Sequence, residues 1–121
     1  MSTDGRARGW RWLAVPAAFA VLALLGVGAR LRDNAPAPRR HVVEISGLAF
    51  HPAVLEVAPG DTVVWINRDI FPHTATAADS AGWSTGILIQ GQSGVFVPSR
   101  RGEAPYFCQL HPIMRGRLNV R

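Results

Sequence analysis

The chain has 121 residues, a length that allows one domain and excludes large multi-layer enzymes. Glycine and proline number 12 and 9, which favours short elements joined by turns over a helical bundle. The formal net charge is +5, but the arginines come without the aromatic platform or recognition helix of a nucleic-acid reader. We therefore expect a small domain, rich in strands and turns, that binds no nucleic acid.

The amino-terminal segment has the features of an export signal or a membrane anchor. Residues 1–11 carry three arginines, and residues 12–29 are uncharged and mostly apolar. Cationic residues before an apolar run keep the start of the segment in the cytoplasm. The run of about 18 residues fits either the core of a signal peptide or a short transmembrane helix, and we leave both open for residues 1–29. Both place the rest of the chain in the periplasm, tethered to the cytoplasmic membrane if the helix is an anchor.

Residues 30–40 are charged and contain two prolines, which predicts an extended linker. The folded domain is then expected to cover residues 41–121. Turn residues recur within it at spacings typical of a small sandwich or barrel. We predict an all-β domain whose extended segments are residues 41–46, 48–57, 62–67, 73–77, 95–97, 104–108 and 116–120, with 62–67 as a central strand.

The region near the carboxyl end carries three candidate metal ligands. Cys108, His111 and Met114 follow one another at equal spacings of three residues. Their thiolate, imidazole and thioether are soft or borderline donors, and a single loop between two strands can wrap them around one ion. Since Cys108 is the only cysteine in the chain, it cannot form an internal disulfide.

A fourth ligand must come from upstream, where three histidines are available. His41 lies at the edge of the linker and His51 stands beside a proline in an extended stretch. His73 follows the predicted central strand and can project at the same end of the domain as the cysteine loop. Two histidines, one cysteine and a weakly held methionine are the ligand set of a type 1 copper site, whereas zinc disfavours the thioether. We therefore expect one copper ion.

Residues 60–73 and 108–116 resemble the cupredoxins, and within them the amicyanin type, because of the short ligand loop with equal spacing. The likeness covers about residues 42–121. It implies a Greek-key β-sandwich with one type 1 copper at one end, held by His73, Cys108 and His111 with Met114 as the long axial ligand. Amicyanin-like proteins have asparagine where this chain has Thr74, a difference that bears on how firmly the two ligand loops are tied together.

The resemblance implies electron transfer rather than turnover of a substrate. We predict an electron carrier that cycles between Cu(II) and Cu(I), acts as a monomer, and exchanges electrons with an extracytoplasmic dehydrogenase or cytochrome. A copper carrier or delivery protein using the same ligands is the alternative. A thiol enzyme with Cys108 as nucleophile is a weaker interpretation, because no acidic or amide residue is placed to orient the histidine base and Met114 has no task.

Two surface features remain open at this stage. Ile70 and Phe71 either form part of an apolar docking rim or pack inward. Arg68, Arg115 and Arg117 either steer an acidic partner or are solvated surface charges. The resemblance also makes the backbone N–H of residue 74 a candidate donor to the cysteine sulfur.

Overall fold

The computed structural model describes residues 36–121, which form strands and no helix. None of these residues belongs to a helix with the length and apolar character needed to cross a bilayer. The prediction of a signal peptide or anchor at residues 1–29 lies outside the described residues. The strands are β1 (Arg40–Ser46), β2 (Ala49–His51), β3 (Val54–Val57), β4 (Thr62–Asn67), β5 (Thr76–Ala77), β6 (Ser93–Phe96), β7 (Gly102–Phe107) and β8 (Arg115–Val120).

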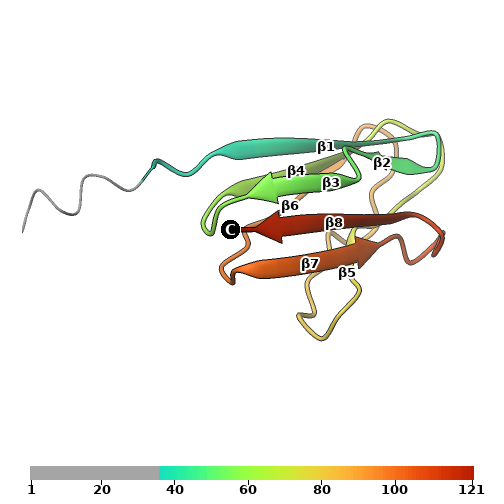
Figure 1. Ribbon diagram of the computed structural model, residues 1–121. Coiled ribbons are helices and arrows are strands. Elements are labelled where there is room, and N and C mark those ends of the chain that lie inside the picture. Colours follow the sequence, from blue (N-terminus) through green and yellow to red (C-terminus); the bar gives the residue numbers. More distant parts are fainter. Residues whose placement is uncertain (1–35) are drawn as a thin grey trace, which may run out of the picture. The chain divides into compact units, whose positions relative to one another are not determined.

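The strands form two four-stranded sheets, one in the order β2-β1-β4-β6 and the other in the order β3-β8-β7-β5 (Figure 1). Both sheets are mixed, since β1 runs parallel to β4 and β3 runs parallel to β8 while the remaining neighbours are antiparallel. Residues from both sheets share one hydrophobic core, in which Trp65, Tyr106 and Leu118 are fully buried. The predicted all-β class is therefore confirmed for the described part of the chain.

Strand β4 is central, as its composition predicts, because β1 and β6 flank it. Val63 and Trp65 alternate into the core, as the two-residue period of a strand requires. Val64 points the other way and is also buried. Val64 is flanked by its register partners Val42 on β1 and Val95 on β6. The three valines form a row across the outer face of the sheet.

Several predicted boundaries differ from those observed. The strand predicted at 95–97 is β6, which begins at Ser93 and therefore includes Gly94. A side chain at this position would come within 2.6 Å of Thr85 Cβ, so glycine lets the neighbouring segment pack against the strand. The predicted strand at 73–77 is reduced to β5, and His73 makes only an isolated bridge to Leu88. The extended stretch at 48–57 divides at Pro52 into β2 and β3, in line with the bend expected there.

The loop after β4 and the loop between β7 and β8 emerge at the same end of the sandwich, on the right in Figure 1. Asn67, the last residue of β4, organises the first of these loops from a buried position. Its Nδ2 donates to the carbonyls of Phe71 and Leu88, each at 2.8 Å, and its Oδ1 accepts from Asp69 N–H. The loop thus takes its shape from bonds to the end of a rigid central strand.

Asp61 fastens the opposite end of the first sheet. Its carboxylate accepts the backbone N–H groups of Arg39 and Ala58 and lies 2.8 Å from His41 Nε2. The two backbone bonds, followed by the bond to His41, lower the pKa of Asp61 from 3.8 to about 2. The folded protein therefore favours the ionised carboxylate more strongly than the unfolded chain does.

We expect Asp61→Asn to lower the free energy of unfolding at neutral pH. Because the folded pKa is depressed, the contribution of Asp61 is fully present above about pH 4 and is lost as the pH falls towards 2. The difference between wild type and variant in urea unfolding should therefore shrink over that range. Asp79→Asn is the control, since Asp79 accepts only a local bond from Ala81 N–H. A difference that stays constant down to pH 2 would contradict this role.

Candidate metal centre

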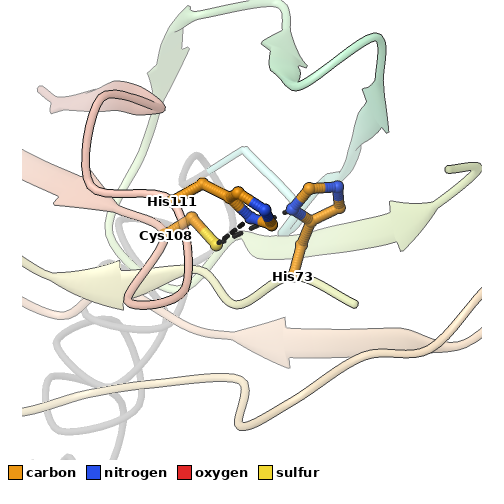
Figure 2. A group of neighbouring side chains, drawn as sticks. All are labelled: His73, Cys108 and His111. Atoms are coloured by element: carbon orange, nitrogen blue, oxygen red, sulfur yellow. Dashed lines mark hydrogen bonds between the residues drawn. The ribbon is translucent and has the colours of Figure 1, made fainter. Parts of the chain in front are cut away.

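Three of the four predicted ligands come together at the end of the sandwich. His73 lies on the loop after β4, whereas Cys108 and His111 lie on the loop between β7 and β8. The Cys108 sulfur is 3.7 Å from His73 Nδ1 and 3.9 Å from His111 Nδ1, the two contacts dashed in Figure 2. One donor atom from each residue lies within 4.8 Å of the others. Two segments about 35 residues apart in the chain therefore present their donors to one point.

The spacing of these donors suits a single small metal ion. Bonds of about 2.0 Å to nitrogen and 2.3 Å to sulfur, meeting at a trigonal angle, place the two donor atoms roughly 3.7 Å apart. The two sulfur to nitrogen distances are 3.7 and 3.9 Å. A His₂Cys set with a weak axial thioether is the donor set of a type 1 copper site. The residues therefore fit copper in both geometry and chemistry.

Met114 is buried at the base of the same loop and belongs to the hydrophobic core. Its carbonyl accepts the N–H of Cys108 at 3.1 Å, and its own N–H donates to the carbonyl of His111 at 2.9 Å. These bonds close the loop on itself, so the positions of its three predicted ligands are fixed by a shared backbone turn.

The other two histidines lie outside this cluster. His41 pairs with Asp61, and His51 contacts the carbonyl of Ser46.

Asp69 is a functional residue that the sequence analysis missed. Its Oδ2 lies 2.9 Å from Nε2 of the fully buried His73. A carboxylate only accepts, so Nε2 carries the proton and the Nδ1 lone pair is left facing Cys108. The carboxylate also accepts the N–H groups of Gly47 and Leu48, at 2.8 and 3.1 Å. Asp69 thus connects the turn between β1 and β2 to the orientation of a ligand.

The charge state of Asp69 supports this role. Partial burial opposes ionisation, but the bonds from Leu48 and Gly47, together with His73, outweigh it and lower the pKa of the carboxyl group. The group is therefore an anion at neutral pH. An acidic residue four positions before a candidate histidine, in a stretch with no helical pattern, is the only signal of this contact that the sequence contains.

Thr74 ties the two ligand loops together in place of the asparagine expected there. Its N–H points at the Cys108 sulfur at 3.3 Å, as the resemblance implies. Its hydroxyl accepts the N–H of Gln109 at 2.9 Å and contacts the hydroxyl of Thr76 at 3.0 Å. Threonine at this position therefore provides a side-chain bond between the two ligand loops.

Comparison with known proteins gives a consistent result. No family model matches the sequence. Amicyanin from Paracoccus denitrificans is 30% identical over 85% of this chain and 91% of its own length. A solved variant of amicyanin in its Cu(I) form is 28% identical with a TM-score of 0.64, covering 74% of this chain and 88% of that one. A copper-containing nitrite reductase from Thermus scotoductus SA-01 is 31% identical with a TM-score of 0.63. The match covers 72% of this chain but only 23% of the enzyme.

The sandwich and its His, Cys, His cluster define a small protein with one type 1 copper. The chain belongs to the cupredoxin family of copper electron-transfer proteins, as an amicyanin-like member. When bound, the copper supplies the one-electron chemistry, and the protein supplies fixed donors and a shielded site. The similarity to the nitrite reductase is confined to less than a quarter of that enzyme and therefore indicates a shared fold.

We expect Asp69→Asn to raise the reduction potential of the copper, because the carboxylate stabilises the more highly charged Cu(II) and its removal takes that stabilisation away. Glu44→Gln is the matched control, since Glu44 is an exposed carboxylate already paired with Arg68 at 3.9 Å. Voltammetry of the three copper-loaded proteins measures both effects. Equal potentials for Asp69→Asn and wild type would show that the contact to His73 does not reach the metal.

Proposed function

We propose that this protein carries single electrons by cycling one copper ion between Cu(II) and Cu(I), with His73, Cys108 and His111 as strong ligands and Met114 as the axial ligand. The convergence of the two Nδ1 atoms and the cysteine sulfur at one end of a rigid sandwich carries this proposal. The thiolate and thioether favour Cu(I), and the two imidazoles tolerate Cu(II). Donors held in place by the fold let the ion change charge with little movement.

Three of the four proposed ligands are buried, and the fourth, His111, is partly exposed. His73 and Cys108 are 0% exposed and Met114 is 2% exposed, whereas His111 is partly accessible. Of these four side chains, His111 is therefore the one through which an electron reaches the surface. Burial of the others excludes water from the sulfur and keeps the donor set intact during transfer.

Exposed apolar side chains on the two ligand loops, Ile70, Phe71, Leu110 and Ile113, form what we call the apolar rim of the copper end. Ile113 is 88% exposed and Ile70 is 75% exposed, and Phe71 and Leu110 are also exposed. The sequence left the orientation of Ile70 and Phe71 open, and the structure places both on the surface. Apolar side chains gathered around an electron exit suit brief docking of a redox partner. A dehydrogenase or a cytochrome with a matching apolar face is the partner that we propose.

Charge contributes less to docking at this end. Arg68 lies 3.9 Å from Glu44, whereas Arg117 lies further along β8 and pairs at 3.7 Å with Glu103, near the start of β7. Arg115 is exposed beside the ligand loop and is the remaining one of the three arginines considered from the sequence. We therefore propose that apolar contact dominates recognition, with Arg115 as a minor electrostatic element.

We place this activity on the outer side of a cytoplasmic membrane, with residues 1–29 as the signal or anchor that brings the domain there. The arginines before an apolar run support this location. The copper-delivery alternative uses the same donors, and it requires that the metal leave readily. Rapid loss of copper to a chelator would favour delivery, whereas retained copper with reversible reduction favours electron transfer.

Met114→Gln tests the axial ligand. An amide oxygen favours Cu(II) over Cu(I), so the reduction potential should fall while copper is retained. Met114→Leu keeps a side chain of similar volume without any donor and is expected not to lower the potential. Reversible voltammetry of both copper-loaded variants makes the comparison. If glutamine and leucine shift the potential alike, Met114 acts only as a core residue.

Ile113→Glu tests the docking rim without a known partner. Electron self-exchange brings two copies of the protein together, and contact through the rim would place the new carboxylates face to face. Self-exchange measured by NMR line broadening in mixtures of oxidised and reduced protein should slow by at least about tenfold. Val97→Glu is the control, since Val97 is also an apolar surface residue, half exposed, but directly follows β6 and lies outside the ligand loops. Equal rates for the two variants would remove the rim from the docking proposal.

A further inference from the structure

The end of the sandwich opposite the copper carries four exposed arginines. Arg39 and Arg40 lie at the start of β1, and Arg100 and Arg101 lie in the loop between β6 and β7. Backbone bonds join these segments to one turn: Thr62 N–H donates to the carbonyl of Arg39, and Gly60 N–H donates to that of Pro98. In Figure 1 this is the left end, where β1 begins and β8 finishes.

The carboxylates near these arginines are largely engaged by other groups. Asp61 is held by backbone N–H groups and His41. Glu56 accepts from Arg121 and Asn119. Glu103 lies 3.7 Å from Arg117. The exposed carboxylate of Asp79 accepts the N–H of Ala81.

Within residues 36–121, no ion pair involves any of the four arginines. Exposed guanidinium groups on two neighbouring segments therefore form a cationic face. Phosphate oxygens are the acceptors that best match the planar, multiple-donor geometry of arginine.

A groove of about 510 Å³ lies beside Arg100 and Arg101, which both line it. Trp83 and Phe96, which are partly buried against the core, also line the groove, with their rings stacked at 4.3 Å and an interplanar angle of 11°, and Asp79 and Glu103 line it as well. Val97, which follows Phe96 in the chain, is half exposed. Aromatic and apolar side chains flanked by cationic groups are the combination found where proteins meet the headgroup region of a bilayer.

We propose that this arginine face binds the headgroups of anionic phospholipids. The guanidinium groups would contact phosphate, and Trp83 and Phe96 would lie at the level of the headgroups. Residues 36–39 immediately precede β1 and therefore lie at the same end of the sandwich as the arginine face. Lipid bound at this face leaves the copper end, with His111 and its apolar rim, directed away from the bilayer.

Several observations favour lipid over an acidic protein. The four charges lie on two segments around one end of the sandwich, which suits a broad anionic surface. The accessible edges of Trp83 and Phe96 in the neighbouring groove suit the partly apolar headgroup region better than they suit an array of surface carboxylates. Each arginine near an anionic bilayer contributes about fivefold to binding at moderate salt. Removing two arginines should therefore weaken binding by about 30-fold.

Hydrogen exchange of the full copper-loaded chain tests this proposal. The protein is mixed with vesicles of phosphatidylcholine alone, or of phosphatidylcholine and phosphatidylglycerol in a ratio of about three to one, a composition chosen to give an anionic surface. We expect the anionic vesicles alone to slow amide exchange in residues 99–103, while exchange in residues 109–113 at the copper end is unchanged. High salt should abolish the effect, because it screens exposed charges.

A matched pair of variants separates the arginine face from general charge. Arg100→Gln/Arg101→Gln should lose the protection by anionic vesicles, whereas Arg68→Gln/Arg115→Gln, which removes two charges at the copper end, should keep it. Equal exchange in the two vesicle types, or protection at the copper end, would overturn the proposal. Protection that grows with protein concentration in the absence of vesicles would show that a second copy covers the face, and would also overturn it.

Discussion

The copper site depends on holding two loops in a fixed relation before any metal binds. Thr74 provides this connection in two ways, since its N–H points at the Cys108 sulfur and its hydroxyl accepts the N–H of Gln109. Asp69 adds a third constraint by fixing which nitrogen of His73 faces the sulfur. Because these bonds join loops that emerge from the sandwich strands, the donor positions are set by the fold. An ion that changes charge in such a site finds ligands that do not have to rearrange.

The two ends of the sandwich differ in chemistry. At the copper end, Leu110 and Ile113 on the loop of His111 are exposed and apolar, and Arg68 is paired with Glu44. At the other end, arginines are exposed without ion-pair partners among residues 36–121. This division suits a protein that docks its electron-transfer partners at one end and directs its charge elsewhere.

The sequence predicted the strand composition and the clustering of His73, Cys108 and His111 better than the pairing of strands. The spacing of Cys108, His111 and Met114 is local, and β-branched residues in 62–67 mark a central strand. Parallel pairing of β1 with β4, and of β3 with β8, depends on contacts distant in the chain, which local patterns do not encode. Asp69 was missed for a related reason. Its contact with His73 depends on a loop shape set by Asn67, which appears only once the strands are assembled.

Addition of one equivalent of Cu(II), followed by visible spectroscopy, tests the central claim most directly. If the copper binds the Cys108 thiolate between the two histidines, an intense sulfur-to-copper charge-transfer band appears and is bleached reversibly by reductant. The band should vanish in Cys108→Ser and persist in His51→Ala, whose imidazole lies outside the cluster. A protein that binds copper without this band, or a serine variant that keeps it, would contradict the assignment.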